Sequence, residues 1–273
     1  MVEIIVPVYN AADDLARCLA ALARHTPATQ PITLVNDAST DPAVRPQLIN
    51  FVSRRPAAQL LENPQNLGFV KTVNRAMAAG RQDVILLNSD AVVTTGWLPA
   101  LTRCAESDGR IATVTPFSNN AEICSLPEFC QNNPFPDDPD AWGRRVAGVA
   151  SRTYPELPTG VGFCMLIRRR ALDELGLFDE AFGRGYGEEN DFCCRASEAG
   201  GRNVLCDDAY VAHAGGRSFA PLGLKPNGDN LALLLDRFPD YEARVAAFIQ
   251  RDPLAPIRQA ILASDNAGAG SGG

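Results

Sequence analysis

The sequence VEIIVPVYN, at residues 2–10, begins with a nearly continuous run of Val and Ile and ends in Pro, Val, Tyr and Asn. Such a run is typical of a central strand in a parallel sheet, and its polar end indicates a turn. Leucines at helical spacing follow, and a second short apolar run at 32–35 ends in NDASTD at 36–41. The order strand, helix, strand, with polar residues at the strand tips, predicts an α/β fold.

The same alternation continues beyond residue 41. It comprises an apolar run at 59–61, a loop at 63–68, a helical pattern at 70–79 and an apolar run at 84–87. We therefore expect a Rossmann-like, mostly parallel sheet flanked by helices. Ligands of such sheets bind at the carboxyl ends of the strands, where Asn10, Asp37 and Asp90 are expected to lie.

The composition excludes some classes of protein. The chain has 273 residues, enough for a sizeable core, and a net charge of -7 that argues against nucleic acid as the main partner. No run approaches the ~20 apolar residues that span a bilayer, and the start lacks the basic region and long apolar run of a signal peptide. We expect a cytoplasmic protein, or one at the inner face of the membrane.

The cysteines give no sign of a zinc site, because no two of them form a CxxC pair. We interpret them mostly as small buried apolar residues, with Cys124 and Cys130 as the one pair in a loop. The eight are Cys18, Cys104, Cys124, Cys130, Cys164, Cys193, Cys194 and Cys206.

Neither common phosphate-binding fingerprint is present, since the first strand leads into VPVYN and the chain has no GxxxxGK[ST]. This disfavours a dinucleotide dehydrogenase and a P-loop kinase. Asp90 instead follows an apolar strand directly, in LLNSDA at 86–91. A carboxylate at a strand end suits Mg²⁺ or Mn²⁺ bound together with substrate phosphates, whereas the alternative is an Asp that caps a turn.

A Pro- and Asn-rich region at 116–139 indicates a long loop, and we expect residues 116–155 to help form an acceptor pocket. Strand signals return at 163–167, with Gly160 and Gly162 in front of them. A short helix at 170–175 is expected to follow.

The stretch FGRGYGEENDFCCR, at 182–195, places Glu188 and Glu189 where a glycine-rich loop meets the start of a helix. Two acids here could also simply complement the helix dipole, and Asp191 with Arg195 could be an ordinary surface pair.

His213 stands at the end of short strands expected at 203–205 and 209–211, before a glycine loop, where an imidazole could complete a metal site. Three short helices and a Gly/Ser tail close the chain. We divide it into a catalytic domain at 1–223, a helical extension at 224–266 that packs on this domain or forms a homodimer contact, and a flexible tail at 267–273.

Six motifs together resemble the family 2 glycosyltransferases of the GT-A fold over roughly residues 2–220. They are VPVYN at 6–10, NDASTD at 36–41, NLGF at 66–69, NSDA at 88–91, GEENDFCCR at 187–195 and HAGGRS at 213–218. The resemblance implies a bacterial inverting enzyme that uses Mn²⁺ or Mg²⁺. It would move a sugar from a nucleotide diphosphate donor to a hydroxyl of a glycan or lipid-linked acceptor.

The resemblance also implies roles for single residues. Asp37 would contact the base or ribose beside Pro7 and Val8, and Asp90, the last residue of a DxD motif shortened here to NSD, would bind the metal with His213. The residues implied for the nucleotide site are Pro7, Val8, Asn10, Asp37, Asn66 and Lys71.

Where relatives carry a Glu-Asp pair, this chain has Glu188-Glu189, which makes Glu189 the implied general base and leaves Glu188 as the other choice. The loop residues implied to line the donor and acceptor sites are Gly160, Gly162, Gly185, Tyr186 and Asp191. We expect the loop at 183–187 to close over the donor and exclude water.

Two other functions are compatible with parts of the pattern. A nucleotidyltransferase could use a similar α/β domain, but it would need a loop rich in Gly and Arg or Lys where this chain has VPVYNAADD. A catalytically degenerate module that binds nucleotide sugars or glycans is the alternative that is not an enzyme, because the NSD and EE motifs are altered.

Overall fold

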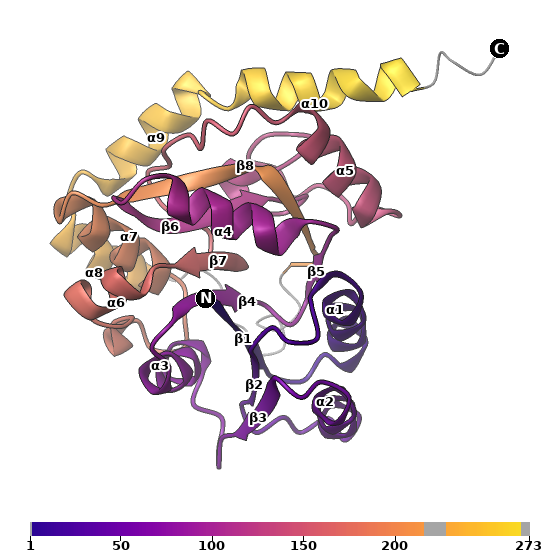
Figure 1. The fold of residues 1–273 in the computed structure, drawn as a ribbon. Coiled ribbons are helices and arrows are strands. Elements are labelled where there is room, and N and C mark those ends of the chain that lie inside the picture. Colours follow the sequence, from indigo (N-terminus) through magenta and orange to yellow (C-terminus); the bar gives the residue numbers. More distant parts are fainter. Residues whose placement is uncertain (1, 216–227, 269–273) are drawn as a thin grey trace.

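The computed structural model describes residues 2–215 and 228–268. An eight-stranded sheet with the order β3-β2-β1-β4-β7-β6-β8-β5 forms its centre, and helices cover both faces (Figure 1). This is the mixed α/β architecture that the sequence predicts.

The first half of the chain builds the parallel part of the sheet. Its elements are β1 (Val2–Val8), α1 (Ala12–His25), β2 (Ile32–Asn36), α2 (Val44–Ser53), β3 (Ala58–Glu62), α3 (Phe69–Ala79) and β4 (Asp83–Leu87). In register, Val8 lies opposite Asn36 and Asn36 opposite Glu62, so β1, β2 and β3 end together at one edge. The polar residues that follow these strands therefore gather at that edge, as expected.

The second half of the chain mixes strand directions. Its elements are β5 (Ala91–Val93), α4 (Trp97–Ser107), β6 (Ile111–Phe117), η1 (Glu122–Cys124), α5 (Pro139–Val149), β7 (Cys164–Ile167), α6 (Arg169–Leu175), η2 (Glu180–Phe182), α7 (Glu188–Glu198) and β8 (Arg202–His213). β7 runs antiparallel between β4 and β6, whereas β6 and β8 are parallel.

The structure corrects three details of the sequence prediction. The two short strands expected at 203–205 and 209–211 are one strand, β8, whose register against β6 shifts between Cys206 and Tyr210. β6 was not expected, because IATVTPF lacks a clear alternating pattern. The region 116–155, expected to help form an acceptor pocket, contains α5 after the loop expected at 116–139, and the Asp138 side chain at the N-terminus of this helix accepts a hydrogen bond from the Ala141 N–H.

Three C-terminal helices pack against this body: α8 (Gly228–Arg237), α9 (Tyr241–Arg251) and α10 (Ala255–Gly268). Phe248, Leu254 and Ile261 are buried in the main hydrophobic core, and α10 runs along α5 (Figure 1). The expected boundary at residue 223/224 and the end of the tail, residues 269–273, lie outside the described residues. None of the described helices is long and apolar enough to cross a membrane.

Candidate active site

A cavity of about 370 Å³ lies where the strands end, and it brings together residues far apart in the sequence. Asp90 and His213 line it, as do Glu188, Glu189 and Tyr186. Small-molecule sites occupy volumes of this order. Five residues that the sequence implicates separately therefore meet in one pocket.

The pairing of β5 with β8 explains why Asp90 meets His213. Ala91 lies opposite His213 in this antiparallel pair, and the Ala214 N–H donates to the Asp90 carbonyl at 3.1 Å. The two side chains face each other, with 3.3 Å between His213 Nε2 and Asp90 Oδ1, and Asp90 is only 4% exposed. The pairing of β5 with β8 therefore brings together two residues that lie far apart in the sequence.

Asparagines of the segment after β6 fix the imidazole. The backbone of His213 donates to Asn119 Oδ1 at 2.8 Å and accepts from Asn119 Nδ2 at 2.9 Å. His213 Nδ1 lies 2.8 Å from the Asn120 carbonyl. Because a carbonyl only accepts, Nδ1 carries a proton and Nε2 is directed at Asp90. This arrangement resembles metal-binding histidines, whose other ring N–H is usually held by an acceptor.

The two groups shift each other's pKa. Burial is the largest single influence on the pKa of His213 and lowers it, but the hydrogen bond to Asp90, the charge of Asp90 and the Asn120 carbonyl together outweigh burial, so the pKa is raised. Burial is also the largest influence on the pKa of Asp90 and raises it, but the hydrogen bond and charge of His213 together with backbone hydrogen bonds outweigh burial, so that pKa is lowered. At neutral pH Asp90 is therefore a carboxylate, the form that binds a cation.

The donor set fits a divalent metal that shares its coordination with a substrate. Within residues 2–215 and 228–268, no group of three or more His, Cys, Asp or Glu side chains could hold a metal by itself. Asp90 and His213 supply one hard oxygen and one imidazole nitrogen. A diphosphate and water would complete six-fold coordination, the usual arrangement for Mg²⁺ at phosphate sites, and Mn²⁺ accepts the same ligands.

The two glutamates begin α7, directly after the glycine-rich loop. Gly185, Tyr186 and Gly187 all have positive φ, at 132°, 72° and 112°, and this irregular backbone turns the helix start into the pocket. A side chain at Gly187 would collide with the ring of Phe182 at 2.9 Å. The loop therefore has its shape because glycine occupies these positions.

The environments of Glu188 and Glu189 differ. Glu188 is 4% exposed, its Oε2 has no hydrogen-bond partner in the described part of the chain, and burial together with Glu189 raises its pKa well above the usual range. Glu189 is half-buried, and burial raises its pKa to about 7. A carboxylate with a pKa near 7 is suited to act as a general base at neutral pH.

Helix α8 anchors the loop in front of these acids. The side-chain amide of Asn230 donates toward the carbonyls of Phe182, Gly185 and Tyr186, at 3.1, 2.9 and 2.8 Å. The C-terminal helices are thus part of the structure that positions the active site.

Asn10 and Asp37, two of the residues implied for nucleotide binding, form hydrogen bonds that stabilise the loops around them. Asn10 Oδ1 accepts from the N–H groups of Thr40 and Asp41 at 2.8 and 3.0 Å. Asp37 is buried, and its carboxylate accepts from the N–H groups of Leu67 and Gly68 at 2.8 and 2.9 Å. These contacts shape the edge beside the pocket, and a role of Asp37 in nucleotide binding stays a prediction.

The other implied nucleotide residues lie along the same edge. Pro7 and Val8 end β1, and Asn66 Nδ2 donates to the Asp37 carbonyl at 3.4 Å. Lys71 lies on the surface of α3 with its Nζ 3.9 Å from Glu180, and it does not line the cavity.

Three of the implied loop residues are engaged in packing. The Gly160 N–H donates to Cys193 Sγ at 3.1 Å, and Gly185 is buried within the loop. Asp191 is fully buried between Arg195 and Arg237, at 2.7 Å from each. Gly162, in contrast, lines the cavity, where an added Cβ would lie 3.7 Å from the Glu189 carboxyl carbon.

Sequence reasoning missed Glu122, which lines the cavity together with Asn120 and Asn132. All three follow β6. Polar residues after a recognised strand would have indicated a site, but β6 itself was not recognised.

Known proteins of similar sequence are glycosyltransferases. The sequence model of glycosyl transferase family 2 matches residues 3–176. The chain is 28% identical over 243 residues to the N-acetylglucosaminyl-diphospho-decaprenol L-rhamnosyltransferase of Mycobacterium tuberculosis, covering 78% of this chain and 76% of that protein. It is also 28% identical over 219 residues to the pre-mycofactocin glycosyltransferase of the same species, covering 78% of this chain and 42% of that protein.

Solved structures share the fold. GalNAc-T7 with UDP, GalNAc and Mn²⁺ superposes with a TM-score of 0.65 at 16% identity, covering 86% of this chain and 47% of that one. Residues 1–349 of S. aureus TarS with UDP-GlcNAc give a TM-score of 0.64 at 16% identity, covering 92% and 72%. The fold is therefore that of the GT-A glycosyltransferases. More specifically, the chain belongs to glycosyl transferase family 2.

Proposed function

We propose that this protein is a metal-dependent, inverting glycosyltransferase. It would transfer a sugar from a nucleoside diphosphate donor to a hydroxyl of a glycan or lipid-linked acceptor. The observation that carries the proposal is one cavity with an Asp90–His213 pair suited to a metal and a glutamate, Glu189, whose pKa is near 7.

Direct displacement at the anomeric carbon requires these groups on opposite sides of the sugar. Glu189 takes the proton of the acceptor hydroxyl, and the oxygen forms the new bond to the anomeric carbon as the bond to the diphosphate oxygen breaks. The electron pair of that bond leaves with the diphosphate. Asp90 and His213 would hold Mn²⁺ or Mg²⁺, which neutralises the charge of the departing group.

Glu188 supports Glu189 by staying neutral. Two adjacent carboxylates in a desolvated site do not both ionise easily, and burial together with the charge of Glu189 raises the pKa of Glu188 well above its usual range, which favours the protonated form. The pair then carries one negative charge, on the residue that faces the acceptor.

The relatives suggest a substrate class. Both mycobacterial proteins are named as glycosyltransferases, and one is named for L-rhamnose transfer to a diphospho-lipid that carries N-acetylglucosamine. We therefore place a nucleotide-activated hexose or deoxyhexose first among donors, and a lipid-linked or glycan hydroxyl first among acceptors. Such acceptors belong to bacterial surface polysaccharide or glycoconjugate synthesis.

A donor screen tests the proposal. The protein with Mn²⁺ is incubated with UDP-GlcNAc, GDP-mannose and dTDP-rhamnose, and nucleoside diphosphate release is measured with water or an alkyl glycoside as acceptor. Glu189→Gln is compared with Glu198→Gln, which changes an exposed acid at the other end of α7. We expect release from at least one donor, lost in the first variant and kept in the second. A protein that binds a donor but never releases diphosphate would instead be a binding module.

A further inference from the structure

A third glutamate faces the cavity from outside the motifs discussed above. Glu122 lies in the segment 118–126 after β6, lines the same cavity as Glu188 and Glu189, and has φ of 47°. No hydrogen bond or ion pair links its carboxylate to the residues described, whereas its backbone carbonyl accepts from the Ser125 N–H at 3.0 Å. A non-glycine residue in the left-handed region is uncommon and often marks a functional position.

The segment 118–126 is itself held firmly. Ser118 forms a β-bridge with Ser125, the Leu126 N–H donates to the Ser118 carbonyl at 2.7 Å, and the Ala121 N–H donates to Ser125 Oγ at 3.0 Å. Asn119 and Asn120, in the same segment, clamp His213. Glu122 therefore projects into the cavity from a support fixed to the metal-binding residue.

The position of Glu122 near Glu189 favours the acceptor side. The two glutamates line the same cavity. The charge of Glu122 also helps to raise the pKa of Glu189, although burial raises it more. The proposed function places Glu189 against the acceptor hydroxyl, so Glu122 would lie near the acceptor sugar.

We infer that Glu122 binds hydroxyl groups of a neutral acceptor sugar and excludes acidic sugars from the acceptor position. The inference rests on the proposed function. A carboxylate accepts hydrogen bonds from two neighbouring hydroxyls of a pyranose ring, and these charge-assisted bonds are the stronger kind. A uronic acid in the same place would bring another carboxylate toward Glu122 and Glu189.

Repulsion of this kind is large enough to set specificity. Two like charges about 5 Å apart, at an effective dielectric constant of about 20, repel strongly enough to change binding by more than tenfold. Asn132, which also lines the cavity, is uncharged and adds no discrimination by charge.

The test compares neutral acceptors with an acidic one, and within this set octyl glucoside and octyl glucuronide differ only at C6. Octyl glycosides of glucose, N-acetylglucosamine and mannose are the neutral probes, and octyl glucuronide is the acidic one. Each is assayed with Mn²⁺ and the donor that the screen selects, using wild-type protein, Glu122→Gln and Glu122→Ala. Glu128→Gln is the control, because Glu128 is an exposed acid close to Glu122 in the sequence that does not line the cavity.

We expect wild-type protein to use a neutral probe over the glucuronide, and Glu122→Gln to reduce that ratio of kcat/KM at least tenfold. At a pH above the acidic limb of the hydrolysis profile, donor hydrolysis without acceptor should change less than the acceptor ratio does in every variant. Glu122→Ala should raise the KM of the neutral probe as well, because both hydroxyl contacts are lost. Glu128→Gln should match wild type throughout.

A second measurement needs no acceptor. Some ionisable groups affect the pKa of Glu189 or have their own pKa affected by it. They are Glu188, Tyr186, Cys193 of α7, Tyr241 of α9 and Glu122. Removing the charge of Glu122 should move the acidic limb of the hydrolysis profile to lower pH.

An unchanged acceptor ratio would overturn the inference. So would a parallel loss of hydrolysis and transfer, which would place Glu122 on the donor side, and so would donor hydrolysis with no neutral probe accepted. If wild-type protein hydrolyses none of the donors, the proposed function fails instead.

Discussion

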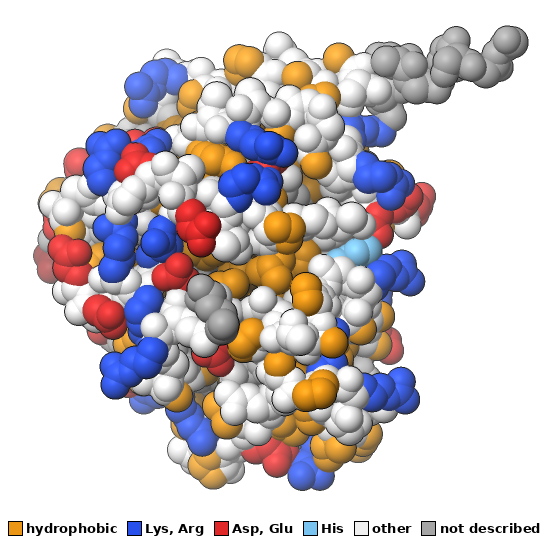
Figure 2. All heavy atoms as spheres, in the orientation of Figure 1, with side chains coloured by type: hydrophobic (Ala, Val, Ile, Leu, Met, Phe, Trp, Pro, Cys, Tyr) orange, Lys and Arg blue, Asp and Glu red, His pale blue; other side chains and the backbone are white. Residues whose placement is uncertain are grey.

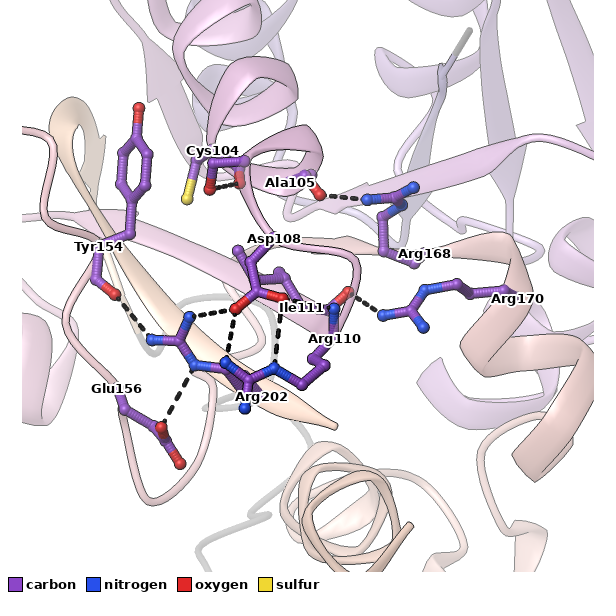
Figure 3. Close-up of polar contacts among 11 residues, drawn as sticks. Cys104, Ala105, Asp108, Arg110, Ile111, Tyr154, Glu156, Arg168, Arg170 and Arg202 are labelled. Atoms are coloured by element: carbon purple, nitrogen blue, oxygen red, sulfur yellow. Dashed lines mark hydrogen bonds and ion pairs between the residues drawn. The ribbon is translucent and has the colours of Figure 1, made fainter. Parts of the chain in front are cut away.

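Charged side chains are arranged differently at the two ends of the strands. Where β6 and β8 begin, Arg202 contacts Asp108 at 3.0 Å and Glu156 at 3.3 Å, and Arg110 contacts Asp108 at 2.9 Å (Figure 3). Arg168 and Arg170 donate to backbone carbonyls at the same edge (Figure 3). Where the strands end, Asp90, Glu122, Glu188 and Glu189 share a cavity with His213, and no Arg or Lys among the described residues lines it.

The charged groups where β6 and β8 begin stabilise the fold, whereas the acids of the cavity are available to interact with a ligand. At the first edge, hydrogen bonds from Arg110 lower the pKa of Asp108, so this acid is more stable ionised in the folded protein. At the second edge, burial raises the pKa of Glu189, so ionising this acid destabilises the fold. On the face shown in Figure 2, Lys and Arg lie among Asp and Glu. Acids in a cavity that no described Arg or Lys lines are therefore the better guide to the active site.

The largest expected effect is loss of the metal. Exhaustive EDTA treatment, or Asp90→Ala, should lower turnover by at least about 10³-fold, because the leaving diphosphate loses its neutralising charge. Readdition of Mn²⁺ should restore the EDTA-treated wild type but not the variant. Activity that survives both treatments would show that Asp90 and His213 are an ordinary ion pair.

Next in size is the loss of the base. Glu189→Gln keeps the shape of the side chain but takes no proton, and should lower kcat by roughly 10²- to 10⁴-fold with donor affinity nearly unchanged. Glu188→Gln should lower kcat less. Steady-state kinetics and calorimetry of donor binding check both. If the two variants exchange behaviours, the base is Glu188.

A smaller effect is expected from the contact that holds the glycine-rich loop. Asn230→Ala removes the donor shared by three carbonyls and should lower kcat about tenfold, since a typical hydrogen bond contributes about 1 kcal/mol. Hydrogen exchange of residues 183–189 should become faster. Asp229→Asn, at the exposed neighbouring position, is the control. Unchanged exchange in the alanine variant would remove α8 from the positioning of the loop.

The same comparison predicts a gain in stability at the active site. The folded pKa of Glu189 is about 7, against 4.5 ordinarily, so wild-type protein loses stability as pH rises from about 4.5 to 7. Glu189→Gln lacks this loss and should be more stable than wild type by about 1–3 kcal/mol at pH 8, with little difference at pH 4.5. Urea unfolding at the two pH values measures this. A variant that is less stable at pH 8 would contradict the assignment.

The smallest effect is expected from the ion pairs of Arg202, where β6 and β8 begin. Arg202→Gln should cost about 1 kcal/mol or less, because partly exposed ion pairs contribute little, and should leave kcat unchanged. A double-mutant cycle with Glu156→Gln isolates the pair. A large loss of activity would mean that this edge communicates with the cavity.

The sequence predicted the parallel half of the fold well, because hydrophobic periodicity is a local signal. Strands near 32–35, 59–61 and 84–87 were placed within a residue or two. The antiparallel position of β7 between β4 and β6 depends on contacts between distant segments, and no local pattern indicates it.

Some residues of the candidate site could likewise be predicted from local sequence signals, whereas others could not. Glu188 and Glu189 could be found because glycines and a helix start mark them locally. Asp191, three residues after Glu188, has the same local signs but is neutralised by Arg237, which lies 46 residues further along the chain. Glu122 could not be found, because its place in the cavity depends on β6 and on a backbone conformation that its sequence does not indicate.

The irregularity in β8 has a consequence for how this chain can change in length. Cys206 lies opposite Pro116 and Tyr210 opposite Phe117, so residues 207–209 have no counterparts on β6. Side chains alternate between the two faces of a strand, and His213 follows this irregular segment directly along β8. Inserting or deleting one residue there would turn the imidazole away from Asp90, whereas a change of two would keep its face. Length variation that keeps the imidazole on the face of Asp90 is therefore restricted to even steps within this strand.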